Sequence, residues 1–138
     1  MLLIYFILCL VASFVHPVTP TFIKERGFPD FLNGALFSTM SLVSFICSPF
    51  FGYISDRRGR KPVLIASMLI YALAQFLFGR ATTVAAALTA RALAGVASAS
   101  YAVPTLAYMV DVTAPEERGR WLAYYTALLS IGSSIGYF

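Results

Sequence analysis

Long apolar stretches, separated by short clusters of charged residues, dominate this sequence. Only 12% of the residues are charged and 59% are hydrophobic, whereas a soluble domain carries about 25% charged residues. A chain of 138 residues cannot hide so much apolar surface in one core, because a small domain leaves a large share of its surface exposed to solvent. The pattern therefore predicts a protein whose main solvent is lipid.

The apolar stretches also predict how the chain crosses a membrane. An α-helix rises about 1.5 Å per residue, so about 20 apolar residues span the hydrocarbon core. Five spans are expected, at residues 1–21, 31–54, 62–79, 83–110 and 121–138. The expected fold class is all-α, a polytopic transmembrane helical bundle.

Basic residues at the ends of these spans predict the orientation. The net charge is +4, and its placement at span ends favours the lipid bilayer, not nucleic acid, as the partner. The loops after the second and fourth spans carry six basic residues, whereas the other two loops carry three. The positive-inside rule then predicts a multi-pass protein of the cell (inner) membrane, with the amino terminus, loop 2–3 and loop 4–5 in the cytoplasm. The six basic residues are Arg57, Arg58, Arg60, Lys61, Arg118 and Arg120.

Enzymatic chemistry has no support in the sequence. Cys9 and Cys47 both lie inside apolar runs, without the spacing of a metal or redox site. No nucleophile–base pattern is present either, so neither catalysis nor a cofactor is expected.

The segment between the second and third spans carries a specific motif. Residues 52–64 read GYISDRRGRKPVL, which resembles the loop 2–3 signature of the major facilitator superfamily, glycine-x-leucine-x-aspartate-arginine-x-glycine-arginine-lysine. Ile54 stands at the leucine position. The matching positions that define this conformational motif are Gly52, Asp56, Arg57, Gly59, Arg60 and Lys61. A plain positive-inside loop with a helix-breaking glycine would account for the basic residues, but not for Asp56 or Gly52.

Each motif position has a physical interpretation. Gly52 would permit a close helix crossing, and Gly59 a turn that a β-carbon would hinder. Asp56 and Arg60 could join a charge network at the cytoplasmic rim. The resemblance implies that the motif latches helix ends together, with Asp111 as the partner of Arg60. Residues 111–120 (DVTAPEERGR) likewise resemble the family's loop 4–5 pattern and add Arg118 to the expected charge partners.

Arg91 is a charge within the fourth span. It lies roughly 12 Å from the start of that span, where an arginine costs about 2.5–3.5 kcal/mol on insertion scales. It is therefore expected either to face a water-filled cavity or polar partner, or to snorkel to the outer interface. Arg91 and Gly95 resemble the arginine-x-x-x-glycine motif of the family's proton-linked drug exporters, in which the arginine takes part in proton coupling. The match is partial, since Ala97 replaces the next family glycine and Tyr137 stands where a proline is usual in span five.

His16 is the only histidine, near the outer end of the first span. Residues 16–20 (HPVTP) resemble the end of the first helix in tetracycline-type exporters. Histidine titrates near neutral pH, so a coupling role is open, and so is a polar packing role. Together with Met40 and Arg91, His16 is a candidate for the wall of a substrate cavity.

The resemblance implies a secondary active transporter of small molecules, with proton-coupled efflux by alternating access. The alternatives are a nutrient or metabolite uptake symporter of the same superfamily, or a truncated fragment without independent transport. Family members usually have twelve helices in two halves built from three-helix repeats, so the chain is expected to supply the first five. Its expected partners are a small-molecule substrate, protons and the remaining carboxy-terminal helices.

Overall fold

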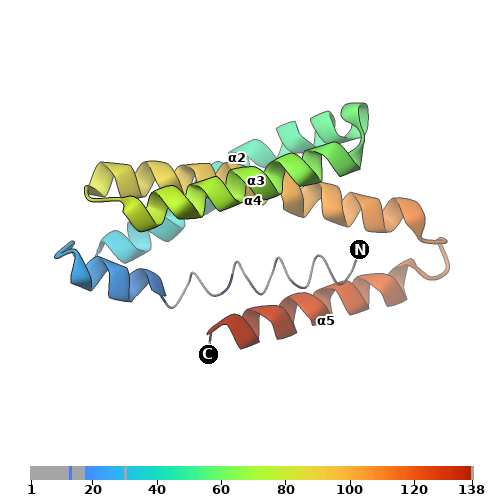
Figure 1. Ribbon diagram of the computed structural model, residues 1–138. Helices are drawn as coiled ribbons and strands as arrows, with labels where there is room; N and C mark the ends of the chain where they lie inside the picture. The colour runs from blue at the N-terminus through green and yellow to red at the C-terminus, as the bar shows by residue number, and fades with distance from the viewer. Residues whose placement is uncertain (1–12, 14–17, 30, 138) are drawn as a thin grey trace. The chain divides into compact units, whose positions relative to one another are not determined.

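The regular structure in the described part of the chain is helical. The computed structural model describes residues 13, 18–29 and 31–137. Residues 18–25 are helical, and the prediction of an all-α chain is confirmed. Most of the expected first span, with His16, lies outside the described residues. The helices that follow are α2 (Leu32–Arg58), α3 (Arg60–Arg80), α4 (Val84–Val112) and α5 (Arg118–Tyr137) (Figure 1).

The chain divides into two compact units. Phe31–Tyr108 forms one unit and holds α2, α3 and most of α4. Met1–Asp30 and Met109–Phe138 form the other, which includes α5.

Among the described residues, α2, α3 and α4 are each long and apolar enough to cross a membrane. They contain 27, 21 and 29 residues, which at about 1.5 Å per residue gives lengths of roughly 40, 32 and 44 Å. A hydrocarbon core is about 30 Å thick. The ends of α2 and α4 therefore extend beyond the hydrocarbon, and the basic end of α2 can lie among lipid head groups.

Three helices pack side by side in the Phe31–Tyr108 unit (Figure 1). The rings of Tyr71 and Tyr101 meet edge to face between α3 and α4, with centroids 6.2 Å apart. Most of the buried residues of α4 are small: Ala87, Ala90, Ala94, Ala97, Ala99 and Ser100. Small residues let helix backbones approach closely in lipid, where van der Waals packing drives association.

Large apolar side chains cover the outside of the same unit. Phe45 is 78% exposed, Leu69 68% and Phe76 59%. Water would disfavour a surface of this kind, and a lipid environment makes it favourable. Exposed large apolar side chains, with mostly small buried residues on α4 letting the helices approach closely, are what a membrane-spanning unit requires.

Candidate functional site: a charged hairpin and a buried arginine

A single residue separates α2 from α3. Gly59 has φ 87° and ψ 151°, a conformation that only glycine adopts without strain. The charged residues expected in a loop at 56–61 therefore lie on the last turn of α2 and the first turn of α3. Both helices extend beyond the spans expected at 31–54 and 62–79, because the charged residues continue the helices instead of ending them.

Arg60 ties the start of α3 back to the end of α2. Its Nη1 lies 3.0 Å from Asp56 Oδ1 and donates a hydrogen bond of 3.1 Å to Ser55 Oγ. Ser55 is buried, whereas the Asp56 side chain is 63% exposed. An ion pair with so exposed a partner contributes about 0–1 kcal/mol. The contact thus fixes the geometry of the turn more than it stabilises the fold.

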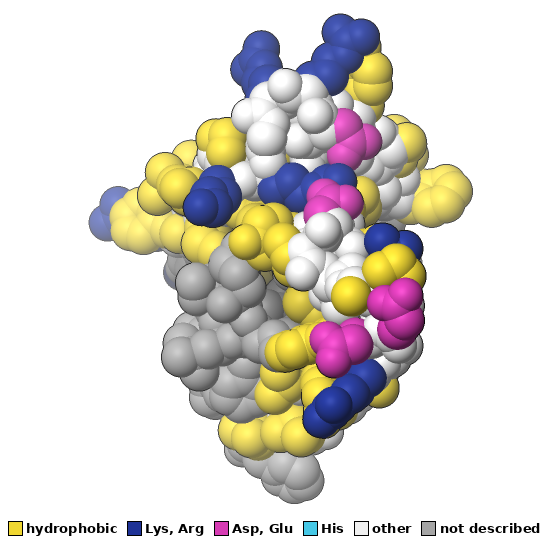
Figure 2. Space-filling view, turned by 90° about the vertical axis from the view of Figure 1, so that its right-hand side faces the viewer, with side chains coloured by type: hydrophobic (Ala, Val, Ile, Leu, Met, Phe, Trp, Pro, Cys, Tyr) yellow, Lys and Arg dark blue, Asp and Glu magenta, His cyan; other side chains and the backbone are white. Residues whose placement is uncertain are grey.

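The remaining basic residues of this hairpin differ in their surroundings. Arg57 stacks on Tyr53, with the guanidinium carbon 4.5 Å from the ring centroid. Arg58 lines a groove between α2 and α3, and Lys61 is exposed. Figure 2 faces the side on which this hairpin lies and shows exposed Lys and Arg side chains in dark blue.

Gly52 lies on the side of α2 that faces α4. A β-carbon built on it would lie 3.5 Å from Val103 Cγ1, an ordinary van der Waals distance. The contact between these two helices is close at this point but leaves room for a methyl group.

Arg91 lies inside the helical unit and is only 2% exposed. Its guanidinium carbon lies 4.0 Å from the ring centroid of Phe78 on α3 and 5.8 Å from that of Phe37 on α2. Cation–π contacts of this kind contribute about 2 kcal/mol when desolvated, which offsets part of the cost of placing arginine in a membrane helix. The burial favours an interior position over snorkelling to the outer interface.

Gly95 lies one turn beyond Arg91 on the same face of α4. A β-carbon there would overlap the carbonyl oxygen of Met40 on α2 and would lie 3.1 Å from Val43 Cβ. The backbones of α2 and α4 therefore touch where the arginine-x-x-x-glycine motif and Met40 meet. Close packing is a sufficient physical reason for this glycine.

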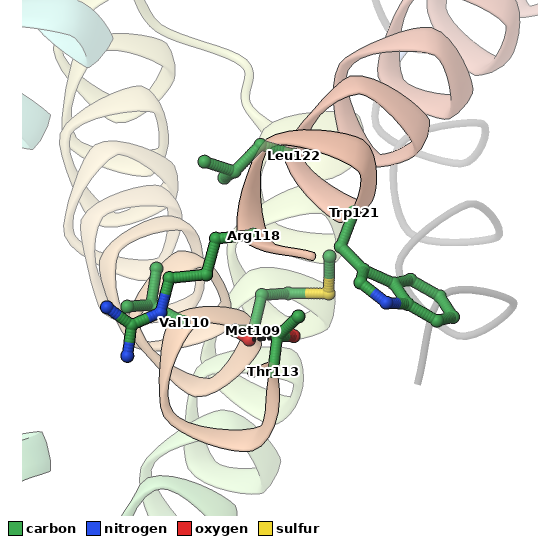
Figure 3. Close-up of a pocket in the computed structure, with 6 residues that line it drawn as sticks. All are labelled: Met109, Val110, Thr113, Arg118, Trp121 and Leu122. Atoms are coloured by element: carbon green, nitrogen blue, oxygen red, sulfur yellow. Dashed lines mark hydrogen bonds between the residues drawn. The ribbon is translucent and has the colours of Figure 1, made fainter. Parts of the chain in front are cut away.

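The turn between α4 and α5 holds the other expected charge partners. Asp111 lies in the last turn of α4, and Arg118 is the first residue of α5. Arg118 lines a shallow hollow at this turn, and the Thr113 hydroxyl donates a 2.6 Å hydrogen bond to the Met109 carbonyl beside it (Figure 3). In Figure 3 the side chains of Arg118 and Trp121 point to opposite sides of the hollow. Asp111 and Arg60 belong to different units, and their pairing stays a prediction.

Three residues of these sites have no signal in the sequence reasoning. Phe37 and Phe78 are two of twelve phenylalanines, and only the register of three packed helices shows that they meet Arg91. Ser55 is one of many serines, and its bond to Arg60 depends on the turn at Gly59. Among the contacts of the hairpin, the ion pair between Asp56 and Arg60 is the one that the sequence indicates, through their spacing of four residues.

The fold and these sites define a polytopic α-helical membrane protein, with a charged hairpin between two apolar helices and a buried cation in a third. The sequence model of the Major Facilitator Superfamily matches residues 1–138. The chain therefore belongs to that superfamily, as the loop 2–3 motif indicated.

Several relatives of known name are similar to this chain. Multidrug resistance protein 2 of Bacillus subtilis (strain 168) is 34% identical over 131 residues, covering 95% of this chain and 33% of that protein. Multidrug resistance protein 1 of the same organism is 32% identical, covering 95% of this chain and 34% of its own length. Tetracycline resistance protein, class C, of Escherichia coli is 31% identical over 125 residues, which cover 88% of this chain and 31% of that protein. The chain spans about a third of the length of these relatives.

Proposed function

We propose that this chain supplies the amino-terminal helices of a secondary active transporter that exports small molecules across the cell membrane in exchange for protons. The observation that carries the proposal is the 34% identity, over 95% of the chain, to Multidrug resistance protein 2. The names of two further relatives point to the same kind of activity. Because the chain covers about a third of each relative, the activity belongs in this proposal to an assembly with further helices.

Arg91 has a defined place in the proposed mechanism. A guanidinium does not lose its proton in a protein, so Arg91 cannot carry the transported proton. It instead supplies a fixed positive charge among α2, α3 and α4, which lowers the affinity of nearby groups for protons. All six acidic residues of the sequence lie at helix ends or between the expected spans. His16 is then the titratable candidate within this chain, and a carrier in the remaining helices is its alternative.

The charged hairpin is proposed to bias alternating access from the cytoplasmic side. Asp56 and Arg60 hold the end of α2 to the start of α3, and Asp111 joins them in one conformation of the transporter. A contact worth up to about 1 kcal/mol changes the ratio of two conformations by up to about five-fold. A weak rim contact is therefore sufficient to alter how often the transporter opens on that side.

Transport by the intact protein tests the export proposal. Cells lacking their own drug exporters are loaded with a fluorescent drug, and its accumulation is followed with and without a protonophore. Export predicts reduced accumulation, restored when the pH gradient is collapsed. Increased accumulation would indicate uptake, and reduced accumulation that survives the protonophore would contradict proton coupling.

Cysteine labelling tests the proposed orientation. Lys61 is replaced by cysteine in a variant in which Cys9 and Cys47 are alanine. A membrane-impermeant maleimide is then applied to intact and to permeabilised cells. A cytoplasmic loop 2–3 predicts labelling only after permeabilisation, and labelling of intact cells would reverse the topology.

A further inference from the structure

A groove of about 290 Å³ lies between the carboxy-terminal part of α2 and the amino-terminal half of α3. Its walls include Phe51 and Ile54 from α2 and Val63 and Ile70 from α3. From Pro62, at its charged end, to Ile70, the lining extends over nine residues of α3, and the rise along the helix between these two residues is about 12 Å. The volume of the groove corresponds to that of roughly ten water molecules, at about 30 Å³ each.

Two buried serines contribute to the lining of this groove. Ser67 and Ser100 are 0% and 2% exposed. Each hydroxyl donates its proton within its own helix, from Ser67 to the Leu64 carbonyl at 2.7 Å and from Ser100 to the Ala97 carbonyl at 2.8 Å. Because both hydroxyl protons are already donated to backbone carbonyls, the two serines have no proton to donate to a ligand. The lining therefore suits a hydrocarbon chain better than a polar ligand.

Arg58 is the charged residue of the groove lining. It is the last residue of α2, and within the described part of the chain it makes no hydrogen bond or ion pair. Two neighbouring basic side chains are engaged elsewhere, since Arg57 stacks on Tyr53 and Arg60 pairs with Asp56. The exposed Lys61 is not part of the groove lining. The groove therefore combines an apolar channel with one available cation at its end.

We propose that this groove binds an anionic phospholipid, with one acyl chain between α2 and α3 and the phosphate against Arg58. The occupant follows from charge complementarity and from the solvent, because α2 and α3 are both long and apolar enough to lie in a bilayer. Basic pockets at the ends of transmembrane helices are suited to anionic head groups. The site requires no transport activity, so it stands independently of the proposed export.

Native mass spectrometry of the purified chain in detergent tests the site. Phosphatidylglycerol and phosphatidylcholine with identical acyl chains are titrated separately. We expect tighter retention of phosphatidylglycerol, and Arg58→Gln should weaken it about five-fold, the effect of one basic residue near a membrane surface, while leaving phosphatidylcholine unchanged. Arg57→Gln removes the same charge one residue away and should change the affinity less than two-fold.

A second pair of variants tests the acyl channel. Ala66 lines the groove, and Ala66→Phe should weaken both lipids by filling it. Ala72 is exposed on the opposite side of α3, so Ala72→Phe adds the same ring and should leave binding unchanged. A photoreactive phosphatidylglycerol, added to the protein in membranes, should crosslink within the groove.

Several results would overturn the proposal. Equal losses for Arg57→Gln and Arg58→Gln would show that the basic cluster acts only as a diffuse field. Equal affinity for the two lipids, or full binding by Ala66→Phe, would remove the head-group site or the acyl channel. Crosslinks that map elsewhere, or a protein helix found in the groove in place of lipid, would assign the surface to another occupant.

Discussion

Replacement of Gly95 by alanine is the sharpest test of how α2 and α4 pack. The added β-carbon would overlap the carbonyl oxygen of Met40 and lie 3.2 Å from its carbonyl carbon and 3.1 Å from Val43 Cβ. The Met40 atoms belong to the backbone and cannot rotate away as a flexible side chain would. We therefore expect Gly95→Ala to push α2 away from α4.

The size of the effect follows from the distances. Carbon atoms pack best at about 3.5–4.0 Å, and a gap of about 0.5–1 Å removes a quarter to a half of the dispersion energy of a contact. Overpacking costs about 1–3 kcal/mol, and the rigid backbone neighbour favours the upper part of that range. Alanine regains about 1 kcal/mol over glycine within a helix. A net loss of about 1–2 kcal/mol in the free energy of unfolding is expected.

Unfolding of the purified chain in mixed micelles, titrated with sodium dodecyl sulfate and followed by circular dichroism, measures this loss. Gly34 and Gly79 are the matched controls, because a β-carbon at either position meets nothing within 4 Å. Their alanine variants should be neutral or slightly more stable. Gly52→Ala should fall between the two classes, since its β-carbon would lie 3.5 Å from Val103.

The order of the variants decides the outcome. If Gly95→Ala unfolds at the same detergent fraction as Gly34→Ala, the close approach of α2 and α4 is refuted. If all four alanine variants lose stability equally, glycine acts through backbone flexibility and not through the space at each position.

Three further predictions concern the hairpin and the buried arginine. Gly59→Ala should lower the free energy of unfolding by about 1–3 kcal/mol in the same titration, because alanine would be strained at φ 87° and ψ 151°. An unfolding curve of Gly59→Ala that matches the wild type would contradict the backbone conformation described for this turn. Asp56→Asn should insert normally but reduce transport by the intact protein, which drug accumulation at equal surface expression measures; undiminished transport would rule out a role for this carboxylate. Phe78→Leu should lower stability by about 1–2 kcal/mol, because it removes the ring 4.0 Å from the Arg91 guanidinium. Phe76→Leu, at an exposed ring that stacks on a surface arginine, should cost less, and equal losses would show that the buried cation–π contact adds nothing.

Much of the fold is predictable from composition, because a continuous apolar stretch that crosses lipid as a single segment pairs its own backbone groups by forming a helix. Once every backbone group must be paired internally, apolar stretches of about 20 residues become helices. The boundaries were harder to predict at 56–61, where charged residues suggested a loop. These charged residues instead continue α2 and begin α3. With lengths of roughly 40 and 32 Å, the two helices reach or exceed a hydrocarbon core of about 30 Å, so their ends lie where charged groups can be hydrated. Only Gly59, with its positive φ, is needed for the turn.

The partners of the buried Arg91 could not be predicted from the sequence, because they depend on how the helices are packed against one another. A single arginine within an apolar span indicates that the charge must be accommodated. Its partners depend on how three helices are rotated about their axes, and nothing in the local sequence sets that rotation. The expectation of a water-filled cavity or a polar partner gave no indication of the rings of Phe78 and Phe37, beside which the structure places the Arg91 guanidinium. Aromatic faces can accommodate a cation without being polar residues.

The short distance between Arg91 and Gly95 has a consequence for the interpretation of transport measurements. Both residues lie on the face of α4 that packs against α2, one at a ring of Phe37 and the other at the backbone of Met40. Displacement of α2 by a side chain at Gly95 would also move Phe37 relative to the guanidinium. A Gly95 variant that loses transport is therefore evidence for coupling only if its unfolding curve is unchanged. Arg91→Lys separates the two roles further, since it keeps the charge but lacks the planar group that stacks on an aromatic face. Transport retained by Arg91→Lys, together with lower stability, would assign coupling to the charge and packing to the guanidinium plane.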